Sequence, residues 1–334
     1  MKTKYLMTVC FMVAGLSVLA QPRSIRFEPT AYHNNFSHKF LPVLRVKQGD
    51  TIKSESVDAG GFDKLGVRMA KSGNPVTGPF YIEGASPGDI VAITLTSVSL
   101  NRDYATTVGS YIKRSVPLNT FKENFDPHAN RVKWKLVIEK GYAKPEMEGE
   151  GLRDFTIPLN PFLGCVGLAA PIKSKEPLTY SAGEYGGNMD FSKVTAGATI
   201  YLPVFHEGAL LYLGDGHAQQ GDGEINGDAL ETSMDFSFVA RVIKGESPIT
   251  FPRIEDAEYI VSMAMDQSLE NALQKSTQGL IDWIRRDYGL TSVEASQVIG
   301  SLVEYRIPSI ASPDFEIAAM IKKKYLIRLK RIAR

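Results

Sequence analysis

The sequence predicts a mainly β fold with a smaller α+β part at its C-terminal end. Short runs of β-branched and aromatic residues, separated by Gly, Pro and Asp, continue to about residue 250. Helical spacing of apolar residues becomes clear only after Ser268. A chain of 334 residues with 43% hydrophobic residues can bury a large core, so we expect a compact body rather than an extended array.

The first twenty residues have the layout of a secretory signal peptide. Lys2 and Lys4 precede the apolar stretch 5–19, and small residues follow at 18–20. The stretch is short for a membrane-spanning helix, so we expect cleavage and export to the periplasm or the exterior. The predicted organisation is a signal peptide at 1–20, a β-rich catalytic body at 21–250 and an α+β part at 251–334.

Charge and cysteine content exclude several classes of protein. Removing Lys2 and Lys4 from the 38 basic residues leaves 36 against 37 acidic ones, and this near-neutral balance does not favour nucleic acid as a partner. No later segment is apolar enough to suggest stable membrane insertion after signal removal. Cys165 is the one cysteine outside the signal, so the fold must be stable without an internal disulfide.

The strands of the body are predicted from alternation and turn residues. A turn at 85–89 (ASPGD) separates two strands within 79–91, because Pro presets φ and Gly accepts the unusual backbone conformation. Other expected strands lie at 46–54, 94–100, 134–140, 198–205 and 235–243. The apolar run 161–171 (PFLGCVGLAAP) contains two internal glycines, and we expect a loop there that lines a pocket.

The C-terminal part carries the helix signals. Residues 268–286 show a helical apolar stripe that Gly289 ends, and Thr291 with Glu294 forms a capping-box pattern that opens a second helix to about Val303. The basic tail 321–334 is expected to be a solvated final strand.

Two glycine-rich clusters, 186–190 (GGNMD) and 214–224 (GDGHAQQGDGE), stand out because together they hold four acidic side chains and one histidine. In an extended chain, Asp215 and His217 would point to the same side, and Asp222 and Glu224 repeat this spacing. Carboxylates and an imidazole suit a divalent metal that activates water. An uncoordinated carboxylate, most naturally Glu224, could then carry a proton to a leaving amine, with the amides near Gly187 holding the oxyanion.

Other interpretations of these clusters stay open. Asp and Gly are common turn formers, and this property alone could account for the pattern. An EF-hand starting at Asp222 fails because its twelfth position is Ser233 instead of a bidentate Glu. Cys165 lies in an apolar run, which raises the pKa of a thiol, so pocket lining is favoured over a nucleophilic role.

The sequence resembles the acetamidase/formamidase family along nearly its whole length. The resemblance is carried by GGNMD (186–190), YLPVF (201–205), GDGHAQQGDGE (214–224) and NGDALE (226–231), and upstream by HNNF (33–36), GPFYIEGASPGD (78–89) and PFLGCVGLAAP (161–171). It implies a β-sandwich-like amidohydrolase that releases ammonia from small linear amides such as formamide or acetamide. It also implies a bound divalent metal and a homo-oligomer, and one branch of the family opens a γ-lactam.

By position, the resemblance indicates the acidic and histidine residues His33, Asp58, Asp190, Asp215, His217, Asp222 and Glu224. The division into metal ligands, catalytic carboxylates and substrate contacts is our inference from the chemistry of the residues. The metal ligands would be Asp190, Asp215, His217, His33 and Asp58, with zinc as the expected ion and calcium as the alternative. The catalytic carboxylates would be Glu224 and Asp222. The substrate would contact Asn188, Gly187, Cys165 and Phe36.

Two further hypotheses compete with a metal-assisted amidase. One is a secreted β-sandwich module that binds Ca²⁺ and a ligand through its Asp/Gly loops without catalysis. The other is a γ-lactam-opening member of the same family. Turnover of an amide would exclude the non-catalytic binding module. A panel of amides and lactams would distinguish the lactam-opening enzyme from an enzyme specific for linear amides.

Overall fold

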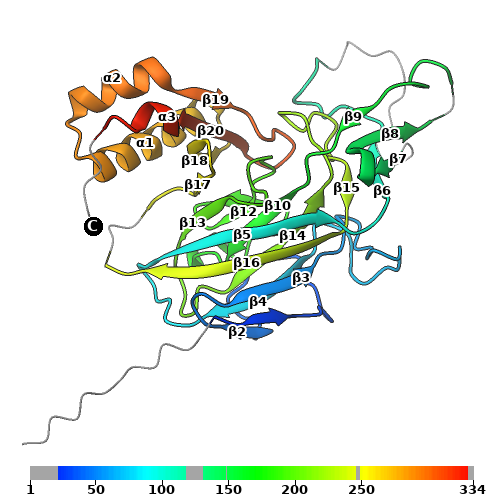
Figure 1. Cartoon of the computed structure of the whole chain (residues 1–334), viewed down its shortest axis with the longest axis horizontal. Coiled ribbons are helices and arrows are strands. Elements are labelled where there is room, and N and C mark those ends of the chain that lie inside the picture. Colours follow the sequence, from blue (N-terminus) through cyan, green and yellow to red (C-terminus); the bar gives the residue numbers. More distant parts are fainter. Residues whose placement is uncertain (1–21, 118–130, 148, 246–248, 330–334) are drawn as a thin grey trace, which may run out of the picture.

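The computed structural model describes residues 22–117, 131–147, 149–245 and 249–329 (Figure 1). The expected signal peptide at 1–20 lies outside these ranges. Within them, no helix combines the length and the apolar character needed to cross a bilayer. Most of the described chain is arranged in two β-sheets, with helices gathered at one end.

The first sheet has nine strands and takes in both early and late parts of the chain. Its long central strands β16 and β5 pair antiparallel, and β13 joins them to the C-terminal strands through β17. In spatial order the strands are β1 (Ser24–Arg26), β3 (Thr51–Glu55), β16 (Met234–Ile243), β5 (Ile90–Leu100), β13 (Thr199–Pro203), β17 (Arg253–Glu255), β18 (Tyr259–Asp266), β20 (Phe315–Lys322) and β19 (Glu304–Arg306).

The second sheet has eleven strands and carries the conspicuous glycine-rich clusters. Its main path is β11 (Ala182–Gly183), β12 (Gly186–Asn188), β10 (Phe162–Leu168), β14 (Leu211–His217), β15 (Glu231–Thr232), β6 (Tyr104–Val108), β7 (Arg131–Val137), β8 (Tyr142–Glu146) and β9 (Ile157–Pro158). In addition, β2 (Leu44–Val46) pairs with β4 (Val76–Ile82), and β4 pairs with β14. Strands β6 to β9 extend to one side of the molecule (Figure 1).

The two sheets pack face to face over the largest hydrophobic core. Ile93 and Phe238 of the first sheet lie in the same buried cluster as Phe80, Val166 and Leu213 of the second. Alternating side chains from two facing sheets are the usual content of a sandwich core. The predicted mainly β, sandwich-like body is therefore confirmed.

The run 161–171 is a strand, so the expectation of a loop there is wrong. All seven residues of β10 are buried. A strand that is covered on both faces has a continuous apolar sequence without alternation, which hides it from a period-two pattern. Its glycines serve close packing: a Cβ atom on Gly167 would lie 2.8 Å from the backbone nitrogen of Gly187 in β12.

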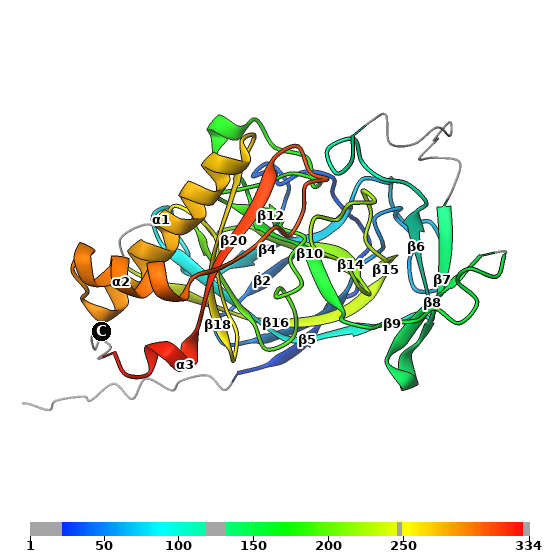
Figure 2. The ribbon, with the colours of Figure 1, turned by 90° about the horizontal axis from the view of Figure 1, so that it is seen from above.

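Two helices form most of the helical part, as predicted. Helix α1 (Leu269–Tyr288) has Ser268 as its N-cap, and Gly289 follows it in the left-handed conformation with φ 64°. Helix α2 (Ser292–Leu302) begins with the complete capping box of Thr291 and Glu294. Both helices pack against β18 and β20 through a second core, and Figure 2 shows them at the end of the molecule opposite β6 to β9.

The tail after β20 differs from its prediction. It turns into the short helix α3 (Lys323–Leu326), whereas a solvated strand was expected. Leu326 is buried in the cluster with Trp283 and Ile284, so the apolar residues of the tail anchor it to α1. Two 3-10 turns, η1 (Ile138–Lys140) and η2 (Ile172–Ser174), complete the regular elements.

The connection between β19 and β20 returns from the helical part to the body. The backbone nitrogen of Gly223 donates to the carbonyl of Ile307 at 2.7 Å, and Gly223 and Ser309 form an isolated parallel bridge. The boundary expected near residue 250 therefore separates segments that share one sheet and one surface. As a division into domains it stays a prediction.

Candidate functional site

Strand β14 and its neighbours bring the acidic and histidine residues together. Asp215 and His217 lie on β14, and Asp190 lies two residues after the end of β12. His217 is the register partner of Glu231 on β15 and of Phe162 on β10. Side chains separated by more than fifty residues of sequence are thus neighbours because their strands pair.

The side chains converge on the buried imidazole of His217. Its Nε2 atom lies 3.5 Å from Asp215 Oδ2 and 3.3 Å from Glu231 Oε1. Two overlapping groups have all their ligand atoms within 4.8 Å of one another: Asp190, His217 and Glu224, and Asp215, His217 and Glu231. We call these five buried residues the His217 cluster.

Each carboxylate of the His217 cluster has one oxygen held by a neighbour. Asn188 Nδ2 donates to Asp190 Oδ2, Asn74 Nδ2 donates to Asp215 Oδ2 at 2.9 Å, and the backbone nitrogen of Ala229 donates to Glu231 Oε1 at 2.9 Å. Ser309, from the connection between β19 and β20, donates to Glu224 Oε2 at 2.7 Å. Such outer hydrogen bonds fix the orientation of groups that bind a metal.

The remaining polar atoms of the cluster are those that a cation would satisfy. Asp190 Oδ1, Asp215 Oδ1, Glu231 Oε2 and both ring nitrogens of His217 are buried without a hydrogen-bond partner among the described residues. Leaving buried polar groups unpaired costs about 1–3 kcal/mol each, more for charged ones, so their grouping is suited to a cation. Carboxylate oxygens and an imidazole nitrogen are ligands that Zn²⁺ accepts.

Gly164 on β10 faces the side chains of Asp215, Asp190 and His217 at close range. A Cβ atom at this position would lie 2.6 Å from Asp215 Oδ2, 2.7 Å from Asp190 Oδ1 and 2.9 Å from His217 Cε1. These separations are too short for any side chain. The His217 cluster therefore fits a divalent metal by its donor set, its unpaired atoms and this cradle.

Three residues of the cluster adopt the left-handed backbone conformation. The φ angles are 41° for Asp190, 59° for Asp215 and 47° for Glu224. A non-glycine residue held in this region costs on the order of 1–3 kcal/mol and persists where the surroundings enforce it, often at a functional site. This conformation also shows that Asp215 does not follow the simple alternation of an extended strand, although its side chain reaches His217.

Burial dominates the electrostatics of the cluster. Burial raises the pKa of Glu231 to about 8 and also raises the pKa values of Asp190 and Glu224. Burial opposes charge on His217, but the carboxylates of Glu231 and Asp215 outweigh it and raise the pKa of the imidazole well above its usual value. Without a cation the cluster therefore holds protons that metal binding would displace.

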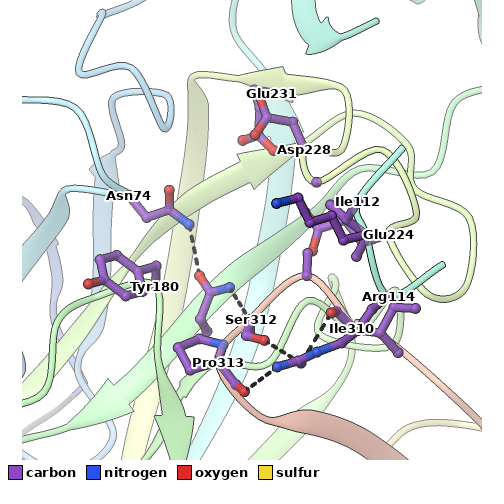
Figure 3. Close-up of a pocket in the computed structure, with 14 residues that line it drawn as sticks. Asn74, Ile112, Arg114, Tyr180, Glu224, Asp228, Glu231, Ile310, Ser312 and Pro313 are labelled. Carbon is purple, nitrogen blue, oxygen red and sulfur yellow. Dashed lines mark hydrogen bonds between the residues drawn. The ribbon is translucent and has the colours of Figure 1, made fainter. Parts of the chain in front are cut away.

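An open cavity of about 450 Å³ leads to the cluster (Figure 3). Glu224 and Glu231 line it, whereas Asp190, Asp215 and His217 lie behind its wall. Residues 310–313 of the connection between β19 and β20 also line it, and Arg114 donates to the carbonyls of Ser312 and Pro313 there. Two buried carboxylates thus face a space open to a small molecule.

The chain is similar to known proteins of the acetamidase/formamidase family in both sequence and fold. The sequence profile of the acetamidase/formamidase family matches residues 169–311, which include every member of the His217 cluster. A candidate formamidase of Schizosaccharomyces pombe is 25% identical over 270 residues, 65% of this chain and 65% of that protein. The crystal structure of an acetamidase from Yersinia enterocolitica superposes with a TM-score of 0.76 at 25% identity, covering 94% of this chain and 96% of that one.

The chain is similar to the acetamidase/formamidase family over residues 169–311 and shares the fold of a solved acetamidase. The alignment with the S. pombe relative leaves about a third of that protein unmatched. A gamma lactamase from Delftia acidovorans shares the fold with a TM-score of 0.55 at 16% identity, with 88% of each chain covered.

Three of the residues assigned by position in the acetamidase/formamidase family lie outside the His217 cluster. Asp58 forms a buried ion pair with Arg102, with Nη2 and Oδ2 2.6 Å apart. His33 is half-buried and stacks on Phe40 with a centroid distance of 3.9 Å. Asp222 pairs with Arg306, whose Nε donates to Asp222 Oδ2 at 2.7 Å. Their assigned roles stay predictions.

The four residues expected to contact substrate have different surroundings. Asn188 lines the cavity and donates a hydrogen bond to Asp190, so it lies between the cavity and the His217 cluster. Cys165 is buried; its thiol donates to Asn188 Oδ1 at 2.9 Å, and burial raises its pKa well above the usual range. Gly187 lies in β12, paired with β10 and β11, and Phe36 packs against Tyr185 and Tyr212.

Sequence reasoning missed Glu231. It ends the run NGDALE, whose likeness to the family was noted, but no motif pointed to its side chain. Its place opposite His217 depends on the pairing of β14 with β15, a contact that a single sequence does not reveal. Ser309 and Ser312 were missed for the same reason, because they reach the site from beyond the helices.

Proposed function

We propose that this protein is a metal-assisted amidohydrolase that converts small linear amides to ammonia and a carboxylate. The observation that carries the proposal is the His217 cluster. Each of its four carboxylates has one oxygen held by a neighbour, and Asp190, Asp215, Glu231 and the His217 ring keep buried polar atoms without a hydrogen-bond partner among the described residues. Similarity to the acetamidase/formamidase family, with formamidase and acetamidase relatives, supports the same reaction.

Asp190, Asp215 and His217 would hold the metal. They surround the cradle at Gly164 and do not line the cavity, so binding substrate would not displace them. A bound Zn²⁺ supplies Lewis acidity, which favours both attack by water and polarisation of an amide carbonyl. Zinc is proposed ahead of calcium because calcium takes six to eight oxygen ligands and has little use for an imidazole.

Glu231 and Glu224 would transfer a proton from the attacking water to the leaving nitrogen. Hydrolysis adds one water across the C–N bond: the water oxygen bonds to the carbonyl carbon, and the nitrogen leaves with the two protons it had and one from the water. A carboxylate with a pKa near neutrality does this well, because it can take that proton and release it to the nitrogen. Glu231, with a pKa of about 8 and a free Oε2, has this property, and Ser309 keeps Glu224 beside it.

Ammonia release from formamide and acetamide tests the proposal. We expect activity in the metal-loaded protein, a loss of at least about 10²-fold in His217→Ala, and a similar loss after chelation that added Zn²⁺ reverses. His206→Ala is the matched control, because His206 binds the carbonyl of Ala170 away from the cluster. Full activity in a sample shown to be metal-free would exclude the metal role.

The same assays address the competing functions. A Ca²⁺-binding module predicts tight Ca²⁺-dependent ligand binding and no turnover of any amide, so turnover excludes it. A γ-lactam included in the substrate panel tests the lactam-opening alternative.

We further propose that the protein is exported and assembles as a homo-oligomer. Export follows from the signal-like segment at 1–20, and oligomer formation follows from the resemblance to the family. The N-terminal sequence of the mature protein and its mass in solution test these two points.

A further inference from the structure

Glu231 lies on a strand of only two residues. Strand β15 pairs with β14 through Glu231 with His217 and Thr232 with Gly216, and with β6 through Glu231 with Thr106. So short a strand offers few backbone hydrogen bonds to fix its place. The place matters, because Glu231 Oε1 lies 3.3 Å from His217 Nε2. Other contacts must therefore hold β15.

The side chain of Arg102 makes such contacts to both residues of β15. Arg102 lies between β5 and β6 and is 6% exposed. Its Nη2 atom donates to the carbonyl of Glu231 at 3.3 Å, and its Nε atom donates to Thr232 Oγ1 at 3.0 Å. Because Arg102 binds the main chain of Glu231, the carboxylate stays free to face His217 and the cavity.

The guanidinium of Arg102 is itself fixed by the body. Its Nη1 atom donates to the carbonyl of Asp63 at 3.2 Å, and Nε also donates to the carbonyl of Tyr104 at 3.1 Å. Its central carbon lies 4.3 Å from the ring centroid of Tyr104. A planar guanidinium can serve acceptors in several fixed directions, whereas the ammonium of a lysine is a single point. The acceptors around Arg102 therefore call for arginine.

Asp58 supplies the negative charge that the buried guanidinium needs. Its Oδ2 atom accepts from Arg102 Nη2 at 2.6 Å, and its Oδ1 atom accepts from the backbone nitrogen of Phe62 at 2.9 Å. A buried charge is costly without a partner. Both oxygens of Asp58 are thus occupied, and Asp58 is in neither group of described side chains close enough to share a metal.

We propose that Arg102, supported by Asp58, is a positioning residue that holds Glu231 against His217. The inference rests on the proposed function, in which Glu231 transfers a proton, and it adds the residues that place this carboxylate. Arg102 does not line the cavity, so it acts through β15 and not on the substrate.

Arg102→Lys in the full-length, metal-loaded protein tests the inference. Lysine keeps a positive charge beside Asp58 but cannot reach all the acceptors of the guanidinium. We expect kcat for acetamide to fall about 10²-fold, because a displacement of about 1 Å in a reacting group has an effect of this size. KM should change less than about threefold, and the metal stoichiometry should stay that of the unmodified protein.

A double-mutant cycle separates positioning from a general loss of structure. In the Glu231→Gln background the group that Arg102 positions is gone, so Arg102→Lys should lower kcat less than about twofold. An equal loss in both backgrounds, an unchanged kcat in Arg102→Lys alone, or loss of the metal from that variant would overturn the inference.

Thr232→Val is a milder second variant in case Arg102→Lys does not fold. It removes one acceptor of Arg102 Nε and leaves the pair with Asp58 intact. We expect a loss in kcat of about tenfold, coupled to Glu231 in the same way. An unchanged kcat in Thr232→Val would contradict the proposed role of Arg102.

Asp58→Asn tests the support given to Arg102. It should lower kcat in the same direction while the metal stoichiometry is unchanged. A loss of metal would make Asp58 a ligand and overturn this part of the inference. Arg253→Lys is the matched control, because Arg253 is also 6% exposed but packs on Trp283 of α1, with 5.1 Å between its central carbon and the ring centroid. Its kcat should equal that of the unmodified protein.

Absence of amide hydrolysis by the unmodified protein would instead refute the proposed function. Crystal structures of the metal-free protein and of its Arg102→Lys variant then decide the role of Arg102. An increase of about 1 Å in the distance from Glu231 Oε1 to His217 Nε2 would support it, and an unchanged distance would refute it.

Discussion

Residues around the His217 cluster have a different role from its members: they hold the carboxylates in place by hydrogen bonds. One oxygen of each carboxylate accepts a hydrogen bond from Asn188, Asn74, Ser309 or the amide of Ala229, and this sets the direction of the other. Ligands that are oriented before a cation arrives lose less entropy on binding it, so affinity is gained from groups that never touch the ion.

Gly164→Ala should abolish metal binding without removing any ligand. The new methyl would lie within 2.9 Å of atoms of Asp215, Asp190 and His217, so these side chains must move apart. Displacement of a reacting group by about 1 Å can cost about 10²-fold in rate, and we expect at least that loss in amide turnover. The measurement is metal content together with ammonia release, supported by a circular dichroism spectrum that shows the fold is retained.

Gly221→Ala is the matched control, because a Cβ atom there would have no neighbour within 4 Å. If Gly164→Ala bound metal with full stoichiometry and normal activity, the cradle would have no role in binding.

Metal affinity should increase with pH. The pKa of His217 is raised above its usual value and that of Glu231 is raised to about 8, so both groups carry protons at neutral pH when no cation is present. A metal must displace these protons, and the dissociation constant should therefore be smaller at about pH 8 than at about pH 6. Competition with a chromogenic chelator measures it; a constant that does not change over this range would contradict the protonated state of the cluster.

Local sequence spacing indicated four of the five members of the His217 cluster. Asp190, Asp215, His217 and Glu224 stand in two glycine-rich clusters and could be found from residue types alone. Glu231 and Ser309 could not, because strand pairing and a chain return from beyond α2 place them. Asp58 was predicted as a metal ligand, but it forms an ion pair with Arg102 instead. Because Arg102 is 44 positions away, the sequence of the loop around Asp58 does not reveal this partner.

At the level of elements, helix α1 lies unusually close to the sheet at Gly279. A Cβ atom there would be 2.2 Å from Ser262 Oγ of β18 and 3.1 Å from Phe251 Cδ2. Elsewhere in a helix, Ala is more favourable than Gly by about 1 kcal/mol. At this contact we expect overpacking to outweigh propensity.

Gly279→Ala should therefore lower the free energy of unfolding by about 1–2 kcal/mol. Gly300→Ala in α2 is the comparison, because it meets open space and should be neutral or stabilising by up to about 1 kcal/mol. Urea unfolding of both variants gives the two values. Equal effects at the two positions would show that the close approach at Gly279 is not rigid.

Elements with strong local signals were predictable, and those defined by burial were not. The capping box at Thr291 and the terminating Gly289 marked helix ends that the structure reproduces. Strand β10 was hidden because it is buried on both faces and so has no alternation. The tail was misassigned because Leu326 is buried against α1, a contact its basic sequence does not suggest.

At the scale of the whole molecule, the C-terminal part is integral to the body. Strand β13 pairs with β17, so Ile200 and Ile254 are register partners across the expected boundary. Two further strands, β18 and β20, continue that sheet, and Ser309 donates a hydrogen bond to Glu224 of the His217 cluster. Body and C-terminal part therefore stabilise each other.

A chain that ends at residue 250 should fail to reach a native state. It would expose the edge of β13 and the apolar surface that β17 and β18 cover, and exposed strand edges promote aggregation. We expect strong binding of a hydrophobic dye, rapid proteolysis and no amide turnover, whereas a chain ending at residue 329 should behave like the full-length protein. A soluble, protease-resistant product of the first truncation would show that residues 251–334 are an independent addition.

The hydrogen bond from Ser309 to Glu224 also bears on the timing of maturation. The chain is made from its N-terminus, so the last wall of the cavity emerges after all five members of the His217 cluster have been synthesised. A ribosome-bound polypeptide that lacks this wall has an incomplete cluster, so the connection between β19 and β20 must be synthesised and fold back over the body before the proposed centre is assembled.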